Sequence, residues 1–208
     1  NFHESRDYVD YTDDIYVGYR YFETIPGAAE KVVYPFGYGL SYTTFDVETV
    51  SSGVVNSNCT SEANKLYAKV RVTNTGKFSG KEVVQVYIAK PQGKLGKPAK
   101  ELAAFEKTRE LQPGESQLMI LTWEINDMAS YDDLGKVKKS AYVLEAGSYD
   151  IYVGTSVRDV TKADYSYILN HDVITEQLSA KLVPTSLPKR MLADGSYEAL
   201  PQSEPVDT

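Results

Sequence analysis

The stretch of sequence that decides the fold is Phe36-Gly37-Tyr38-Gly39-Leu40-Ser41-Tyr42-Thr43-Thr44-Phe45. Its two glycines allow positive φ angles, or close approach to another surface, which a Cβ would resist. The residues that follow them, Tyr42-Thr43-Thr44-Phe45, are the aromatic and β-branched types that suit a half-buried strand. The stretch therefore predicts a turn into the first strand of a β-domain, with a connector before it.

Two runs downstream of this turn alternate between apolar and polar residues, which is the period of a β-strand. Turn signals at residues 74–76 and 79–80 separate the two runs. The apolar sets, which we expect to face a common core, are Leu66, Ala68, Val70 and Val72 in the first run and Val84, Val86 and Ile88 in the second. Their neighbours Lys69 and Gln85 are expected at the surface.

Further short strands are predicted at residues 102–107, 117–123 and 149–153, and one or two more between 165 and 182. A Gly- and Pro-rich loop is expected at 91–98, and a short helical turn near Met128. Residues 117–123 are apolar on both faces, which indicates a central strand covered on both sides or a strand packed against a neighbouring domain. Together these signals predict an all-β, antiparallel β-sandwich of the immunoglobulin or fibronectin type III kind.

The connector contains eight of the seventeen tyrosines of the chain within residues 1–45, without any sustained period. Such a segment is too aromatic for a free linker and lacks an apolar face of its own, so we expect it to lie against another body of protein. The candidate interdomain docking residues are Tyr16, Tyr19, Arg20, Tyr21, Phe22, Phe36, Tyr38 and Tyr42.

Composition limits the classes of function. A formal net charge of −7 argues against nucleic-acid binding, and no apolar run is long enough to span a bilayer. The start at Asn1 lacks Met and an apolar signal segment, so we expect a fragment; a cytoplasmic location is favoured, or a secreted one if the N-terminus is truncated. Cys59 is the single cysteine, and we treat the acceptor tripeptide Asn58-Cys59-Thr60 as a chance match.

The run Tyr16-Val17-Gly18-Tyr19-Arg20-Tyr21-Phe22, followed by the stretch at 36–45, resembles the boundary between the α/β sandwich and the fibronectin type III-like domain of family 3 glycoside hydrolases, the β-glucosidase and β-xylosidase family. The resemblance covers about residues 8–180 and continues through 82–87, 100–105, 113–116, 145–149 and 153–156. It implies a parent that hydrolyses terminal β-linked sugars with retention. Both of its catalytic carboxylates, on a TIM-like barrel and on the α/β sandwich, would lie outside this chain.

The chain is accordingly divided into an aromatic connector at 1–42, a sandwich at 43–182 and a tail at 183–208. Prolines and the lack of alternation predict that the tail is extended or disordered. Residues 189–198, with the sequence KRMLADGSYE, resemble the linker of family 3 enzymes with reversed domain order, in which the fibronectin-like domain leads into the barrel. We therefore favour the reversed order.

A search for chemistry within the chain finds no catalytic candidate. Glycoside cleavage needs two carboxyl groups that face each other across a sugar, whereas Asp13-Asp14 and Asp132-Asp133 are adjacent in sequence and are better explained as turn or cap residues. The histidines, His3 and His171, have no metal-ligand spacing, and we expect no metal and no cofactor. Trp123 is interpreted as a core or interface residue rather than a sugar-stacking platform.

The sequence thus predicts a non-catalytic structural domain of a family 3 glycoside hydrolase. Its partners would be the remaining barrel and α/β sandwich domains, through which the β-linked saccharide is bound. The alternative is a free-standing carbohydrate-binding or adhesion module of the same fold. Such a module would display several exposed aromatic residues on the sandwich itself.

Overall fold

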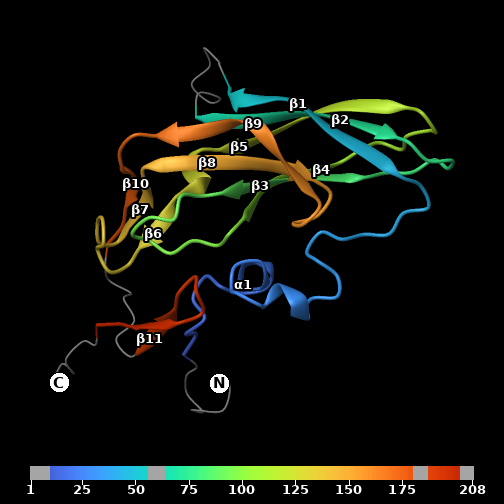
Figure 1. Ribbon diagram of the computed structural model, residues 1–208. Coiled ribbons are helices and arrows are strands. Elements are labelled where there is room, and N and C mark those ends of the chain that lie inside the picture. The colour runs from blue at the N-terminus through green and yellow to red at the C-terminus, as the bar shows by residue number, and fades with distance from the viewer. Residues whose placement is uncertain (1–9, 56–63, 180–186, 202–208) are drawn as a thin grey trace.

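The computed structural model describes residues 10–55, 64–179 and 187–201 (Figure 1). His3, Cys59 and the acceptor tripeptide at 58–60 lie outside the described residues. Within the described part of the chain, no helix has the length and apolar character needed to cross a membrane.

Two antiparallel sheets face each other to form a sandwich, as Figure 1 shows. One sheet has the order β1-β2-β5 and consists of β1 (Phe45–Val54), β2 (Lys65–Asn74) and β5 (Ser116–Glu124). The other has the order β4-β3-β8-β9 and consists of β3 (Val83–Ala89), β4 (Glu101–Lys107), β8 (Gly147–Gly154) and β9 (Val160–Leu169). The predicted fold class is confirmed, and β1 begins where the Gly-rich turn ends.

The core lies between the two sheets and is built from the alternating residues. Leu66, Val70, Val84 and Val86 are 0% exposed, and Ile88 is 1% exposed. They belong to one apolar cluster that also takes in Tyr149 and Ile151 of β8. The period-two pattern therefore identified the inward faces of β2 and β3 correctly, because each strand presents alternate side chains to opposite sides.

Strand β5 differs from the expectation of a central strand. It lies at the edge of its sheet and, among the described strands, pairs with β2. Trp123 and its alternate neighbours Met119 and Leu121 face the core, whereas Leu118 and Ile120 are 50% and 58% exposed. That a neighbouring domain covers these two residues stays a prediction.

A third, smaller sheet with the order β10-β7-β6 continues from one end of the sandwich. Its strands are β6 (Ser130–Asp132), β7 (Ala141–Leu144) and β10 (Val173–Gln177). The predicted helical turn near Met128 is the 3₁₀ turn η2 (Asn126–Met128) just before β6. The loop at 133–140 is arranged around Asp132, whose carboxylate accepts four backbone N–H groups from residues 135–138 at 2.7–3.0 Å.

The predicted loop at 91–98 is held by a buried ion pair. Lys97 and Glu145, 1% and 3% exposed, form a salt bridge, and the Glu145 carboxylate also accepts the N–H groups of Lys94 and Leu95 at 2.6 and 3.1 Å. Lys97 Nζ donates to the Leu95 carbonyl at 3.2 Å. A Cβ at Gly93 would collide with the Glu145 carboxylate, so a larger residue there would displace this carboxylate from its partners.

The described part of the tail is extended, as predicted, but it is paired into a hairpin of β11 (Lys189–Met191) and β12 (Tyr197–Ala199). Gly195, at φ +83°, makes the turn between them. The Met191 N–H donates to the Thr12 carbonyl at 2.8 Å, so the hairpin lies against the start of the connector. Sequence alone missed the hairpin because its strands are too short to show alternation.

The connector crosses the outer face of the β4-β3-β8-β9 sheet, with the short helix α1 (Tyr19–Phe22) beneath β3 and β4 in Figure 1. A 3₁₀ turn, η1 (Ala29–Lys31), follows. The connector thus supplies a third layer over a sheet face that the sandwich core does not use.

Candidate functional site

The carboxylates considered for catalysis occupy structural positions. Burial opposes ionisation of Asp132, yet its four backbone N–H donors outweigh that cost and hold its pKa below the usual range. Asp133 accepts Arg190 Nη1 at 2.8 Å, and Asp14 lies 3.9 Å from the same nitrogen. Asp13 is exposed. Asp132 is the last residue of β6 and its carboxylate caps the loop that follows, in line with the interpretation as a turn or cap residue.

The structure also shows the positions of Trp123 and His171, which the sequence analysis had considered for sugar and metal binding. Trp123 is 5% exposed and belongs to the sandwich core, which confirms the core interpretation over a sugar platform. His171 is exposed in the turn between β9 and β10. Among the described residues, no three His, Cys, Asp or Glu side chains gather in a way that could hold a metal ion.

The eight docking candidates divide into an inner and an outer set. The inner set is buried or half-buried and comprises Tyr16, Tyr19, Arg20, Tyr21 and Phe22, of which Tyr19 and Arg20 contact the sandwich directly. Tyr16 is 2% exposed, and burial raises the pKa of its hydroxyl to about 12. Tyr19 accepts the Leu102 N–H at 3.0 Å, and Arg20 forms a 3.2 Å ion pair with Glu101.

Aromatic contacts connect residues of the inner set to one another and to β3. The Tyr19 ring stacks on Phe36 at a centroid distance of 4.4 Å and meets Tyr87 of β3 edge-on at 6.3 Å. Tyr21 and Phe22 form a second edge-on pair at 5.3 Å. Tyr87 points away from the sandwich core and is nevertheless 0% exposed, because the connector covers it. Burial raises the pKa of the Tyr87 hydroxyl well above its usual range.

Gln85 joins the connector to the sandwich. It is 5% exposed; its amide donates to the Thr155 and Gly37 carbonyls at 2.7 and 3.3 Å, and its oxygen accepts the Tyr87 hydroxyl at 2.5 Å. Gly37, at φ +83°, is required because a Cβ would collide with the Gln85 amide. The expectation that Gln85 lies at the surface is therefore wrong, because the alternation cannot report a layer that covers the outer face.

The outer set is exposed, although Phe36 also stacks on Tyr19 of the inner set. Phe36, Tyr38 and Tyr42 are 44%, 48% and 95% exposed. Tyr34 stacks on Tyr38 at 5.1 Å, with 26° between the rings. We define the outer aromatic patch as these residues with their exposed apolar neighbours: Val33, Tyr34, Phe36, Tyr38, Leu40 and Tyr42. The docking candidates predicted from the sequence did not include Val33, Tyr34 and Leu40. These residues could have been found from the sequence, because they belong to the same apolar run as Phe36, Tyr38 and Tyr42.

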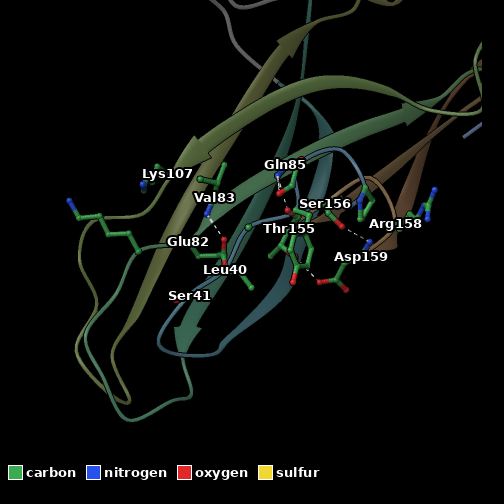
Figure 2. Close-up of a pocket in the computed structure, with 15 residues that line it drawn as sticks. Leu40, Ser41, Glu82, Val83, Gln85, Lys107, Thr155, Ser156, Arg158 and Asp159 are labelled. Carbon is green, nitrogen blue, oxygen red and sulfur yellow. Dashed lines mark hydrogen bonds between the residues drawn. The ribbon is translucent and has the colours of Figure 1, made fainter. Parts of the chain in front are cut away.

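A hollow of about 780 Å³ lies beside this patch, between the 35–41 turn, the facing ends of β3 and β4, and the β8–β9 loop (Figure 2). Leu40 and Ser41 come from the connector, and Glu82 and Lys107 from the sandwich. Burial raises the pKa of the Glu82 carboxyl, although the Val83 N–H opposes the shift. The wall is part polar and part apolar, so patch and hollow together form a surface suited to protein contact.

Comparison with known proteins decides the family. Residues 82–157 match the fibronectin type III-like domain. The whole chain is 62% identical to part of β-glucosidase A from Butyrivibrio fibrisolvens, and 98% of it is 43% identical to part of a β-glucosidase from Ruminococcus albus. A crystal structure of a β-glucosidase from Paenibacillus barengoltzii superposes on 97% of the chain with a TM-score of 0.81 and 45% identity.

The chain belongs to the fibronectin type III-like region of family 3 glycoside hydrolases. It spans 26% and 21% of the length of the two curated relatives, and 23% of the Paenibacillus structure. The relatives are whole β-glucosidases in which this region is one part. In this family 3 region, the inner set fixes the connector to the sandwich, and the outer aromatic patch is the candidate functional site.

Proposed function

We propose that this chain is the non-catalytic structural domain of a β-glucosidase. One observation carries the proposal. Nearly the full length of this chain matches β-glucosidases, but the match covers only 21–26% of the length of those proteins. In the parent, hydrolysis of terminal β-linked sugars with retention is assigned to a TIM-like barrel and an α/β sandwich outside this chain.

The outer aromatic patch docks on those remaining domains. Its six apolar residues fall within ten positions of one another and are 44–95% exposed, which is costly for a surface that stays in water. The matched region is 26% of the length of the Butyrivibrio β-glucosidase A, and in a parent of that kind the other domains would supply the occupant. The inner set contributes indirectly, because it holds the connector rigid and so presents the patch in one geometry.

For the organisation of the parent, we keep the division into 1–42, 43–182 and 183–208 and the reversed domain order. Support comes from the β11–β12 hairpin, which falls on the linker-like residues 189–198. Arg190, whose side chain is 13% exposed, joins this hairpin to Asp133 by an ion pair at 2.8 Å. A second ion pair, at 2.7 Å, links Arg190 to Glu198 on the other strand of the hairpin. A linker held in this way would transmit a fixed orientation to the domain that follows.

Association between the chain and the remainder of its parent tests the docking. Tyr42→Ser should weaken the complex by about 2 kcal/mol, or about thirtyfold in Kd, as buried interface tyrosines do. The Tyr42 side chain is 95% exposed in the chain, so the substitution leaves the chain's own stability intact. Phe105→Ser, at a 68% exposed position on β4, is the matched control and should leave Kd unchanged. Equal effects of the two variants, or no association, would contradict the docking.

Catalysis is tested separately with an aryl β-glucoside. The chain alone should not turn it over, whereas the reconstituted parent should. Turnover by the pure chain that disappears on Asp133→Asn would contradict the non-catalytic assignment.

A carbohydrate-binding module is the second candidate function. Within the described residues of 43–182, four aromatic side chains are exposed: Phe78, Phe105, Tyr131 and Tyr142. Tyr131 and Tyr142 pack together at 5.4 Å on the smaller sheet, whereas Phe78 and Phe105 lie on other elements. Saturable binding of β-glucans by the chain alone would favour the alternative.

A further inference from the structure

Strand β5 leaves one edge of its sheet open. Among the described strands it pairs with β2, and its middle residues Leu118 and Ile120 are 50% and 58% exposed. The connector crosses the other sheet of the sandwich and leaves these two residues uncovered (Figure 1). An open edge presents backbone N–H and C=O groups to which another strand can pair.

The hydrogen bonds at the two ends of the β2–β5 ladder show which backbone groups face this edge. The Asn74 N–H donates to the Glu115 carbonyl and the Ile125 N–H to the Asn64 carbonyl, both at 2.9 Å. Both bonds are in the register of the ladder, which runs without a shift. Residues that exchange hydrogen bonds alternate along an antiparallel pair. The odd-numbered residues of β5 therefore bond to β2, and the even-numbered residues direct their backbone groups towards the open edge.

The three other edge strands of the sandwich carry features that discourage pairing with another chain. Each contains charged residues and belongs to a sheet in which an adjacent strand pair has a register shift. The charged residues are Asp46 and Glu48 in β1, Glu101, Glu106 and Lys107 in β4, and Lys162 and Asp164 in β9. By contrast, residues 116–123, with the sequence SQLMILTW, contain no charged residue, proline or glycine. Strand β5 is thus the edge that is suited to accept another strand.

The residues of β5 are complementary to a second β5 that runs antiparallel to it. A twofold axis through Met119 places Leu118 of each copy opposite Ile120 of the other. These apolar side chains then lie on one face of the joined sheet, where opposite neighbours pack together. Both residues of each pair are even-numbered, so their backbone groups at the open edge also match.

Charged groups at the two ends of β5 favour the same direction of pairing. Arg109 lies at the first end, where its Nη2 donates to the Ser116 carbonyl at 3.5 Å and its Nη1 pairs with Glu115 at 2.7 Å. Glu124 lies at the last end, and its side chain is 44% exposed. Antiparallel pairing brings Arg109 of each copy towards Glu124 of the other. Complementary charges of this kind set the orientation of two partners more than their affinity.

We propose that β5 pairs with β5 of a second copy of this chain, as antiparallel strands about a twofold axis through Met119. The two three-stranded sheets then become one continuous sheet. The same surface is used on both copies, as a twofold interface requires. The proposal does not depend on the β-glucosidase assignment, because it rests on groups within this chain. It also uses a surface separate from the outer aromatic patch.

Sedimentation equilibrium of the chain measures the association. One strand from each copy makes a small interface, so we expect the 23.2 kDa monomer to form a species of twice its mass with a Kd of about 10–100 µM. Ile120→Lys places a charge on the open edge, and the twofold dimer contains the substitution twice. A tenfold weakening at each site therefore raises Kd about a hundredfold.

Ile168→Lys is the matched control, because Ile168 is 65% exposed on the edge strand β9 of the other sheet. It should leave Kd unchanged. Tyr42→Ser, in the outer aromatic patch, should also leave Kd unchanged. Urea denaturation of each variant confirms that the monomer is folded.

Amide hydrogen exchange, followed by NMR, tests the backbone pairing itself. At a chain concentration of about 1 mM, where the dimer dominates, the N–H groups of Leu118 and Ile120 should exchange about tenfold more slowly than when the chain is monomeric. The Ile120→Lys variant provides the monomeric reference for Leu118. The N–H groups of Met119 and Leu121 should be protected in monomer and dimer alike, because they bond to β2.

The proposal is overturned if the chain stays monomeric at about 1 mM, or if Ile120→Lys and Ile168→Lys change Kd equally. Equal exchange of the Leu118 N–H in dimer and monomer would also overturn it. Dissociation by Tyr42→Ser in place of Ile120→Lys would assign the association to the outer aromatic patch, against the proposal.

The whole parent protein distinguishes a second copy from a neighbouring domain. A parent dimer that Ile120→Lys dissociates supports the proposal. A monomeric parent in which the Leu118 N–H is already protected has this edge covered by another of its own domains, and that result overturns the proposal.

Discussion

Replacing Gln85 by Ala tests whether the connector is part of the folded domain. Gln85 lies on the face of β3 that points away from the sandwich core, where alternation alone would predict a change within roughly 0.5 kcal/mol. In the structure, its amide instead joins the Gly37 and Thr155 carbonyls and the Tyr87 hydroxyl. The substitution removes all three hydrogen bonds at once.

The magnitude follows from how well water can replace each bond. Tyr87 is 0% exposed, so its hydroxyl is left as a buried donor, at a cost of about 1–3 kcal/mol. Gly37 and Thr155 line the open hollow, where water can reach their carbonyls, and together they add about 1 kcal/mol. We therefore expect Gln85→Ala to lower the free energy of unfolding by about 2–4 kcal/mol.

Urea denaturation of Gln85→Ala beside Lys69→Ala measures this contrast, because Lys69 is a half-exposed residue of β2 with no core role. Gln85→Glu is a sharper variant, since it places a carboxylate against two carbonyl oxygens. It should be less stable than Gln85→Ala at pH 7 and recover part of the difference at acidic pH, where the carboxyl is protonated. Protease cleavage within 33–42 should become faster in both Gln85 variants. Equal losses for Gln85→Ala and Lys69→Ala would refute the covering role of the connector.

Three further predictions concern stability and are measured by the same denaturation assay. Asp132→Asn should cost about 2–4 kcal/mol at pH 7, because an amide cannot accept four N–H groups. The pKa of Asp132 is lowered in the folded chain, so its stabilisation is present above the ordinary value of 3.8 and the difference from wild type should shrink as the pH falls below it; a constant difference would contradict this role. Glu145→Ala should cost about 3–5 kcal/mol because it leaves Lys97 buried and unpaired, and a loss below about 1 kcal/mol would show that the loop relaxes into water. Ile88→Ala should cost about 2–5 kcal/mol through lost burial and a cavity, and a loss no larger than that of Lys69→Ala would overturn the strand register.

Some features of the candidate site were predictable from the sequence because their signals are local. The density of tyrosines before residue 43 indicated a segment that must lie against protein, and Tyr16 and Tyr19 do so. Local signals could not divide the candidates into inner and outer sets. That division depends on which side of the connector meets β3 and β4, and residues of both sets occur in the same aromatic run.

The sequence by itself determined the strands and their inward faces. Leu66, Val70, Val84, Val86 and Ile88 are buried as the period of two requires, because successive side chains on one strand point to opposite sides whatever else surrounds it.

Only the tertiary structure decided what covers the other faces. Gly37 reaches Gln85 across 48 positions of the chain, and Glu145 holds Lys97 across the same separation. The environment of each of these polar residues is made by a segment far away in sequence. A hydrogen bond or ion pair between distant segments leaves no periodic trace in either of them, so burial of Gln85 and Lys97 follows from the fold and not from the pattern.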